Sequence, residues 1–228
     1  MSIFDGIPFF KDIDKSVAHK NETFCQRKTF SEKELILDYQ DATLDVYFIV
    51  SGLVRILNRT PSGKEMIFGD YGPETFFGEM AAIDNSPRSA NVTAVTNTIA
   101  LIIPGKIFNQ IIASDGTLNL RLMTAFTARI RDLNTRLFER SILDIRHRLY
   151  SELLRLSKPK KQSDTTLAIS PPPYQHDLAA RIGCRREQVN REITTMIEDG
   201  FLEKRKGALV ILKPEVLRKR ILDEMNEG

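Results

Sequence analysis

A glycine, a glutamate and an arginine lie close together in one segment, and their chemistry suits a phosphorylated sugar. Gly78 and Glu79 open an Ala-rich stretch, and the loop after it ends in Pro87, Arg88 and Ser89. A glycine at the start of a helix lets a ligand approach backbone N–H groups that have no partner inside the helix. The arginine can pair with a phosphate, and the carboxylate can accept hydrogen bonds from two hydroxyl groups. We interpret the segment as a site for one phosphate and one sugar diol.

A second interpretation of the same residues needs no ligand. Glu79 and Arg88 would then form a buried ion pair between a strand and a loop. Burying two charges against each other adds little stability, because the cost of desolvation offsets their attraction. We therefore favour the ligand site.

The segment resembles the phosphate-binding cassette of cyclic-nucleotide-binding domains. The resemblance implies that Glu79 binds the ribose 2′-hydroxyl and that Arg88 binds the cyclic phosphate together with the two residues after it. It also implies that two positions on a later helix face the base, and that an arginine one turn before them meets Glu79 across the ligand. No metal is expected. The candidate ligand-binding residues are Gly78, Glu79, Met80, Arg88, Ser89, Ala90, Arg129, Leu133 and Asn134.

Base selection should depend on the two helix positions. Leu133 offers no hydrogen bond, whereas the Asn134 carboxamide can accept one from the adenine amino group or donate one to guanine O6. In related eukaryotic domains a Thr after the cassette arginine favours cyclic GMP, and this chain has Ser89 there. We expect cyclic AMP to be the effector, with appreciable binding of cyclic GMP.

The chain as a whole has the size and composition of a two-domain globular protein. It has 228 residues, of which 42% are hydrophobic and 28% are charged. Its two cysteines are too few for a disulfide framework or a metal site. It has no apolar run of the ~18 residues that a membrane span needs, and its start lacks a secretion signal. We expect a cytoplasmic protein.

Turn residues divide the first half of the chain into short β-rich runs. Pro61 and Gly63 mark a hairpin turn, since proline fixes φ and glycine permits a positive φ. We predict a short helical entry over residues 3–20 and then an antiparallel β-roll, so that residues 1–116 form one domain. The predicted strands are Leu35–Leu37, Val46–Val50, Leu53–Leu57, Glu65–Phe68, Val92–Val95 and Ile99–Ile103.

A long amphipathic helix is predicted after the roll, over residues 117–144. Its apolar residues recur at steps of three and four, which is typical of the seam of a two-stranded coiled coil. So narrow a stripe favours pairing with a second copy over the alternative, packing on the chain's own roll. We predict a dimerisation helix, with a hinge between Ser141 and Ile145. The seam residues are Met123, Phe126, Ile130, Leu133 and Leu137.

The last part of the chain, residues 145–228, is predicted to form a winged helix-turn-helix domain. Gly183 supplies the turn, small Ala179 lets two helices approach, and residues 201–212 have the pattern of strand, basic turn and strand. Residues 116–228 carry a net charge of +7, against −4 for residues 1–115, so a polyanionic partner belongs to the second half. The residues expected between the two helices are Leu178, Ile182, Val189 and Ile193.

The helix-turn-helix resembles that of the cyclic-AMP receptor protein/fumarate-nitrate regulator superfamily of bacterial transcription regulators. Arg186, Glu187 and Arg191 match the Arg-Glu-x-x-x-Arg pattern of that family's recognition helix, whose side chains suit guanine and cytosine. The resemblance, which covers the whole chain, implies a homodimer whose recognition helices are reoriented by the nucleotide toward a palindromic DNA operator, with RNA polymerase as a partner. The candidate DNA-binding residues are Gln175, His176, Arg185, Arg186, Glu187, Arg191, Lys204, Arg205 and Lys206.

Other functions on this scaffold need features that the sequence lacks. A redox or gas sensor would need a cysteine cluster near the N-terminus or paired haem ligands. A regulatory subunit of a kinase would need an inhibitory segment and no helix-turn-helix. No nucleophile and base lie in a catalytic arrangement, so we predict no enzyme. The three histidines have no carboxylate or cysteine cluster beside them in the sequence, and Glu192 replaces an apolar residue common in the family.

Overall fold

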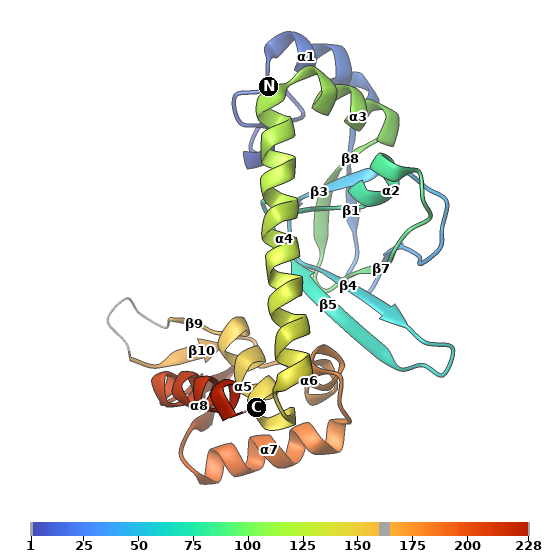
Figure 1. Cartoon of the computed structure of the whole chain (residues 1–228). Coiled ribbons are helices and arrows are strands. Elements are labelled where there is room, and N and C mark those ends of the chain that lie inside the picture. The colour runs from blue at the N-terminus through green and yellow to red at the C-terminus, as the bar shows by residue number, and fades with distance from the viewer. Residues whose placement is uncertain (1, 160–164, 228) are drawn as a thin grey trace. The chain divides into compact units, whose positions relative to one another are not determined.

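The chain divides into two compact units, Met1–Arg129 and Ile130–Gly228, and the division falls inside one continuous helix, α4 (Gly116–Ile142). The computed structural model describes residues 2–159 and 165–227 (Figure 1). Among the described residues, no helix is both long enough and apolar enough to cross a membrane. Each unit is a fold of its own.

The first unit is a β-roll of two four-stranded antiparallel sheets, with strand orders β1-β8-β3-β6 and β2-β7-β4-β5. This confirms the predicted antiparallel roll. Its strands are β1 (Gln26–Phe30), β2 (Leu35–Leu37), β3 (Val46–Ser51), β4 (Val54–Arg59), β5 (Glu65–Tyr71), β6 (Phe76–Phe77), β7 (Asn91–Ala94) and β8 (Thr98–Ile103). Its helical segments are η1 (Pro8–Phe10), α1 (Lys15–Asn21), η2 (Glu22–Phe24), α2 (Glu79–Asp84), α3 (Gly105–Ser114) and the first part of α4.

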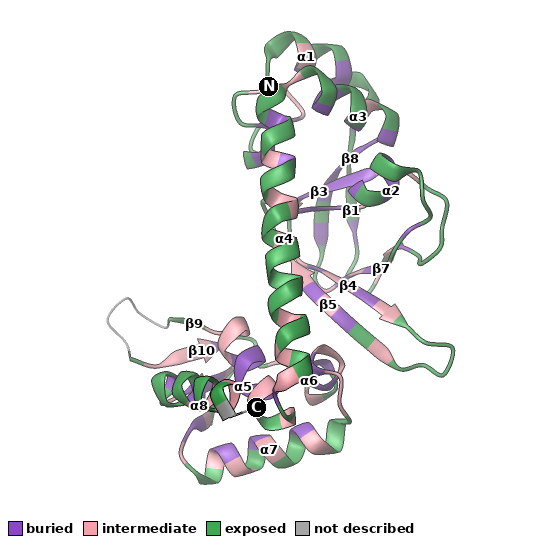
Figure 2. Ribbon diagram, in the orientation of Figure 1, coloured by how far each residue is buried: buried purple, intermediate pink, exposed green. Residues whose placement is uncertain are grey.

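Strand β3 contributes to two hydrophobic cores at once. Val46 and Phe48 belong to the cluster that the first sheet shares with η1, α3 and α4, whereas Tyr47 and Ile49 belong to the cluster between the sheets. Successive side chains on a strand point to opposite faces, so one buried strand supplies both cores. Figure 2 shows the buried residues on β3 and β8. The cassette segment follows directly from this core through Phe76 and Phe77 of β6.

The sequence patterns predict most but not all of this unit. All six predicted strands are present, and the Pro61–Gly63 turn joins β4 to β5, with Gly63 at φ +81°. Strand β1 was not expected, because its first four residues are exposed and show no apolar alternation. The helical entry consists of two short segments, η1 and α1, and helix α3 is an addition to the prediction.

The second unit is a winged helix-turn-helix preceded by two helices. A four-stranded antiparallel sheet of order β11-β12-β10-β9 packs with α5, α6, α7 and α8 around one core. The winged domain was predicted and is present, whereas β9, β10 and α8 are additions. The elements are α5 (Ile145–Leu156), β9 (Lys158–Pro159), β10 (Leu167–Ile169), α6 (Gln175–Ile182), α7 (Arg186–Glu198), β11 (Leu202–Arg205), β12 (Ala208–Ile211) and α8 (Pro214–Glu227).

Candidate ligand and DNA-binding sites

Gly78 joins β6 to α2 in a conformation that only glycine adopts readily. Its φ is +84°, and a Cβ at this position would lie 2.7 Å from the Asp45 carbonyl oxygen and 2.9 Å from Arg88 Nη1. Any side chain would therefore push the first turn of α2 away from Arg88. The glycine holds Glu79, the first residue of α2, next to this arginine.

The Arg88 side chain is almost completely buried and is held by three oxygens of the same unit. Its Nε donates to Thr43 Oγ1 at 3.0 Å, Nη1 to the Gly78 carbonyl at 2.7 Å, and Nη2 to the Asp45 carbonyl at 2.9 Å. Burial lowers the pKa of the guanidinium, and nearby acidic groups partly offset this. The guanidinium has five N–H donors. The three bonds therefore leave one N–H on each terminal nitrogen.

Glu79 is also buried, but its partner is Arg129 of α4. Arg129 Nη1 donates to Glu79 Oε1 at 2.5 Å, and Nη2 donates to the Phe76 carbonyl at 2.5 Å. The same guanidinium lies 4.6 Å from the Phe76 ring centre and 5.0 Å from that of Tyr71. Burial raises the pKa of the Glu79 carboxyl, and the charge of Arg129 partly offsets the rise.

These contacts differ from the interpretation that needs no ligand, in which Glu79 pairs with Arg88. The ion pair of Glu79 is with Arg129, and no ion pair joins Glu79 to Arg88 within the described residues. Both side chains are 2–3% exposed, so neither lies in an open cleft. Replacing Arg88 by Ala would strand buried carbonyl oxygens.

The other candidate ligand residues are more exposed. Ser89 Oγ donates to Met80 Sδ at 3.7 Å, and the Met80 side chain lies at the surface. Ala90 is half-buried. Leu133 and Asn134 lie about one turn after Arg129 on α4, in the second compact unit, and both are exposed.

Sequence reasoning missed several residues that surround the cassette. Thr43 and Asp45 hold Arg88, and Tyr71 packs against Arg129. Asn58 of β4 donates to the Ser89 carbonyl at 3.2 Å. Thr43, Asp45 and Asn58 are distant from the cassette in the sequence and reach it only through strand pairing and loop packing, so no local pattern marks them. Tyr71 is close to the cassette in the sequence, but its partner Arg129 is on α4.

Most of the predicted seam on α4 is exposed within the single chain. Met123, Ile130, Leu133 and Leu137 are each more than half exposed. Phe126 differs, because it packs against the core of the first unit. The stripe therefore presents an apolar face along the helix.

The helix-turn-helix of the second unit has the predicted geometry. Leu178, Ile182, Val189 and Ile193 are all buried between α6, α7 and the sheet. Gly183 ends α6 with φ +72°, and a Cβ there would lie 2.9 Å from Arg140 Nη2. The turn thus needs glycine both for its conformation and for the arginine that packs over it.

The candidate base-reading residues project from the start of α7. Arg186, Glu187 and Arg191 are exposed, and they form no hydrogen bond or ion pair with the residues that the structure describes. The start of the helix is fixed by the Gln188 side chain, which accepts from the Arg185 N–H at 3.0 Å. The helix therefore presents three charged side chains that are free to contact a ligand.

The first turn of α6 places Gln175 and His176 near this helix. Gln175 Nε2 donates to Asn190 Oδ1 of α7 at 2.7 Å. The His176 ring is exposed and stacks on Tyr174, with ring centres 5.3 Å apart. Tyr174 was not among the candidates, although it is 71% exposed.

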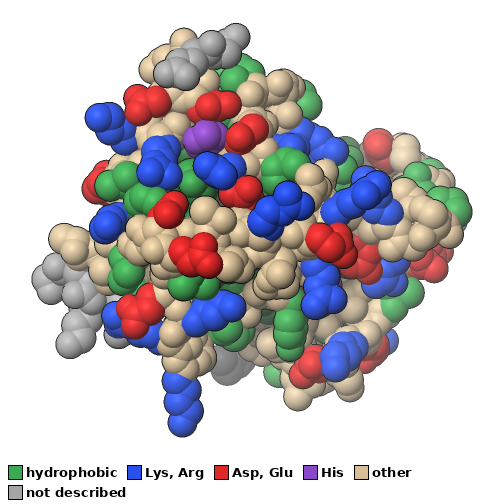
Figure 3. All heavy atoms as spheres, turned by 90° about the horizontal axis from the view of Figure 1, so that it is seen from below, with side chains coloured by type: hydrophobic (Ala, Val, Ile, Leu, Met, Phe, Trp, Pro, Cys, Tyr) green, Lys and Arg blue, Asp and Glu red, His purple; other side chains and the backbone are tan. Residues whose placement is uncertain are grey.

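The wing carries the remaining basic candidates. Lys204 and Arg205 end β11, and Lys206 lies in the turn before Gly207. All three basic residues are exposed, and Arg205 pairs with Glu203 at 2.7 Å. Figure 3 looks from below, the side on which α7 lies in Figure 1, and shows Lys and Arg side chains among Asp and Glu.

The unexpected Glu192 does not disturb the packing of α7. Its carboxylate accepts from Arg146 Nε of α5 at 2.9 Å. This hydrogen bond raises the pKa of the Arg146 guanidinium. The charge at this position therefore joins two helices of the unit.

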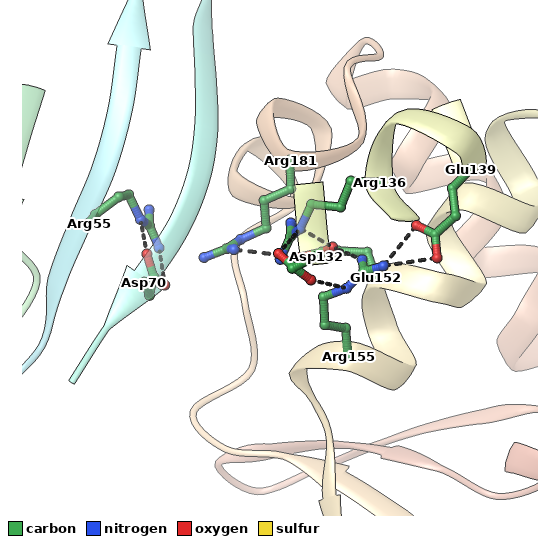
Figure 4. A network of polar contacts seen from close by, with 8 residues as sticks. All are labelled: Arg55, Asp70, Asp132, Arg136, Glu139, Glu152, Arg155 and Arg181. Carbon is green, nitrogen blue, oxygen red and sulfur yellow. Dashed lines mark hydrogen bonds and ion pairs between the residues drawn. The ribbon is translucent and has the colours of Figure 1, made fainter. Parts of the chain in front are cut away.

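A charged network ties the end of α4 to α5 and α6 within the second unit (Figure 4). Buried Glu152 accepts from Arg155 at 2.6 Å and from Arg181 at 3.4 Å, and its carboxylate lies 3.6 Å from Arg136. Arg155 also donates to both oxygens of Glu139, at 2.9 and 2.7 Å. Burial lowers the pKa of Arg155, but these carboxylates raise it above its ordinary value. The network crosses the break between α4 and α5, where the sequence predicts a hinge.

All three histidines have carboxylate neighbours, and His147 has two. His19 Nδ1 lies 3.3 Å from Glu22 Oε1, and His176 Nε2 lies 3.1 Å from Asp177 Oδ1. His147 Nδ1 lies 2.9 Å from Asp144 Oδ1 and 3.6 Å from Glu224 Oε2 of α8. Asp144 also caps α5 by accepting from the His147 N–H at 2.8 Å. The expectation of a histidine with no carboxylate beside it is wrong here. Because these groups bond to one another, we interpret the cluster as a contact between α5 and α8.

The sequence matches two known families over more than two thirds of its length. Residues 27–115 match the cyclic nucleotide-binding domain, and residues 147–220 match the Crp-like helix-turn-helix domain. A CRP-like cAMP-activated global transcriptional regulator of Mycobacterium tuberculosis is 27% identical over 176 residues, which cover 77% of this chain and 79% of that protein. The cyclic AMP receptor protein of Thermus thermophilus is 26% identical over 226 residues, 98% of each chain.

Solved structures share the fold. The regulator CLP of Xanthomonas campestris, described as responsive to c-di-GMP, has a TM-score of 0.74 at 21% identity, over 87% of this chain and 99% of that chain. A CooA mutant of Carboxydothermus hydrogenoformans has a TM-score of 0.76 at 15% identity, over 97% and 98%. With its cyclic nucleotide-binding domain and Crp-like helix-turn-helix, this chain belongs to the CRP/FNR family of transcription regulators.

Proposed function

We propose that this regulator is a homodimer whose binding to palindromic DNA is controlled by a cyclic nucleotide, with cyclic AMP as the productive effector. One observation carries the proposal. Next to Gly78, three protein oxygens fix the buried Arg88, and within the described residues its two terminal nitrogens each keep one N–H without a partner. A guanidinium with spare N–H donors can bind a phosphate through charge-assisted hydrogen bonds.

The ribose and base contacts follow from the neighbouring groups. Glu79 accepts from the ribose 2′-hydroxyl, with Arg129 holding its carboxylate in place. Asn134 reads the six-position of the purine, and Leu133 adds no hydrogen bond, so discrimination between cyclic AMP and cyclic GMP is incomplete. Several relatives are named as activated by cAMP, which supports this choice.

Dimerisation uses the exposed stripe of α4. Met123, Ile130, Leu133 and Leu137 present an apolar face at coiled-coil spacing. An exposed apolar stripe of this kind costs free energy in water and favours a partner with the same stripe. A dimer also has two recognition helices, one for each half-site of a palindromic operator.

The nucleotide acts by shifting a population of conformations. In the state that binds DNA, two recognition helices reach successive major grooves ~34 Å apart. The nucleotide favours this state because it binds the two states with different affinities. The bonds of Glu139 to Arg155 and the ion pair of Arg136 with Glu152 cross the break between α4 and α5, so rotation about Ser141–Ile145 would have to stretch them.

DNA is read by the exposed charged residues of α7 and contacted along its backbone by the wing. Arg186 and Arg191 donate to guanine, and Glu187 accepts from cytosine. The phosphates are contacted by the wing and by residues at the starts of α6 and α7. These residues are Lys204, Arg205, Lys206, Arg185, Gln175 and His176. RNA polymerase is the expected partner at the promoter.

The test combines ligand binding with DNA binding on the full chain. Calorimetry with cyclic AMP, cyclic GMP and cyclic di-GMP should give binding of the two mononucleotides and none of the dinucleotide. In Asn134→Ala, the ratio of the affinities for cyclic AMP and cyclic GMP should move closer to one. Binding of cyclic di-GMP alone, or an unchanged preference in Asn134→Ala, would contradict the ligand assignment.

A further inference from the structure

Asn58, a half-buried residue of β4, carries one buried polar atom without a partner in the described part of the chain. Among the residues that the structure describes, its Oδ1 is the one buried side-chain oxygen or nitrogen with no hydrogen-bond partner. Buried polar groups nearly always find a partner, because leaving one unpaired costs free energy. An acceptor of this kind indicates a donor that arrives from outside the chain.

The position of Asn58 connects this atom to the cassette. Asn58 lies on β4 directly after Leu57, which pairs with Asn91 of β7. Its Nδ2 donates to the Ser89 carbonyl at 3.2 Å, and Ser89 is the residue after Arg88. A carbonyl can only accept, so this bond fixes the orientation of the carboxamide. The amide end is therefore committed to the cassette, and Oδ1 is left for another donor.

The ligand of the proposed function limits what that donor can be. A cyclic phosphate diester has no hydrogen to donate, and the ribose 2′-hydroxyl is assigned to Glu79. The purine six-position is assigned to Asn134 on α4. The remaining exocyclic donor of a natural purine is the 2-amino group of guanine. In the syn conformation this edge of the base folds back over the ribose toward the phosphate, and the resemblance to the cassette assigns Ser89 to that phosphate.

We propose that Asn58 is a specificity-determining residue that reads the 2-amino group of cyclic GMP through Oδ1. The inference rests on the proposed function and extends it to a residue outside the cassette. Adenine has only hydrogen at its two-position, so Asn58 adds nothing to the binding of cyclic AMP. Asn58 therefore contributes to the affinity for cyclic GMP, which Asn134 and Leu133 of α4 do not exclude.

Cyclic inosine monophosphate gives a direct test, since it differs from cyclic GMP only by lacking the 2-amino group. Calorimetry on the full-length protein should show cyclic GMP binding about 5- to 10-fold more tightly than cyclic IMP, the effect of one hydrogen bond. In Asn58→Leu the two affinities should become equal within about twofold. The affinity for cyclic AMP should stay within about threefold of wild type, which shows that the variant is folded.

Asn119→Leu is the matched control, because it makes the same change at an exposed asparagine of α4 that lies outside the candidate ligand-binding residues. It should retain the ratio of cyclic GMP to cyclic IMP affinity. Equal affinities in wild type, a ratio unchanged in Asn58→Leu, or a ratio lost equally in Asn119→Leu would each overturn the proposal. If no cyclic mononucleotide binds, the proposed function fails as well; binding of cyclic AMP with equal cyclic GMP and cyclic IMP affinities overturns only this inference.

Discussion

Glu79 of the cassette and Arg129 of α4 are joined by a 2.5 Å hydrogen bond in which the Glu79 side chain is 4% exposed and that of Arg129 25%. Arg129 is also the last residue of the first compact unit, one residue before the division at Ile130. The contact therefore connects the ligand-binding segment to the helix at the point where the second unit begins. In the proposed switch, a ligand that bonds to Glu79 would act directly on Arg129 through this contact.

Glu79→Gln is expected to weaken cyclic AMP binding about 10- to 150-fold, because a hydrogen bond to a charged group contributes about 1.5–3 kcal/mol. The amide keeps the shape of the side chain and one acceptor for Arg129. Calorimetry measures the loss. Asp84→Asn, an exposed carboxylate on the same helix, is the control and should bind as wild type does. Equal affinities in Glu79→Gln and wild type would contradict the assigned role.

Glu79 should also give stability a pH dependence of known sign. Burial raises the pKa of its carboxyl in the folded state. Above about pH 4.3 the unfolded chain ionises this group more readily, so the free energy of unfolding falls as pH rises toward the folded-state pKa. The glutamine of Glu79→Gln does not ionise, so the variant does not lose this stability as pH rises. The melting temperature of the variant minus that of wild type should therefore increase from pH 4 to pH 7. A difference that stays constant over this range would contradict the prediction.

Arg186→Ala and Lys206→Ala should separate base reading from phosphate binding. Arg186→Ala is expected to lose about 1–3 kcal/mol at one G·C pair and to tolerate other bases there. Lys206→Ala should weaken all sequences alike and reduce the slope of log affinity against log salt by about 0.9. Fluorescence anisotropy with a selected operator and single-base variants measures both. If the Arg186→Ala protein kept the wild-type base preference at every operator position, Arg186 would not recognise a base.

Ile130→Glu is expected to convert a dimer into a monomer. Ile130 is 57% exposed in the single chain and lies on the apolar stripe of α4. A second copy would bury the new carboxylate without a partner, which is costly. Arg131→Glu, an exposed neighbour in the charged series between the seam residues, is the control and should remain dimeric. Sedimentation equilibrium measures the mass of each protein in solution. A dimeric mass for the Ile130→Glu protein would exclude this seam as the dimer interface.

The sequence predicted those parts of the site that are local in the chain. Gly78, Glu79 and Arg88 stand out because one turn needs a glycine and the two charges lie within the same short segment. The turn of the helix-turn-helix was predictable for the same reason. The apolar period of α4 marked it as an amphipathic helix, and the continuous apolar run of Val46–Val50 marked β3 as a buried strand.

What the sequence did not predict depends on tertiary packing. Thr43, Asp45 and Asn58 reach the cassette through a loop and a neighbouring strand, and each is an ordinary polar residue in its own segment. Strand β1 is nearly all exposed, so it lacks the alternation that marks a strand. The burial of Arg88 follows from the glycine and the loop that enclose it. These contacts, strand β1 and the burial of Arg88 all depend on residues that are distant in the sequence.

In the proposed function, a cyclic nucleotide controls DNA binding through the cassette. The most direct measurement is the affinity of the full-length protein for an operator selected from random DNA, with and without saturating cyclic AMP, for wild type and Glu79→Gln. We predict that cyclic AMP tightens wild-type binding by about 10-fold or more, within the usual range of allosteric coupling. Glu79→Gln should bind the same DNA at the ligand-free level and gain nothing at that cyclic AMP concentration. A wild-type affinity that is the same with and without cyclic AMP and cyclic GMP would contradict the claim.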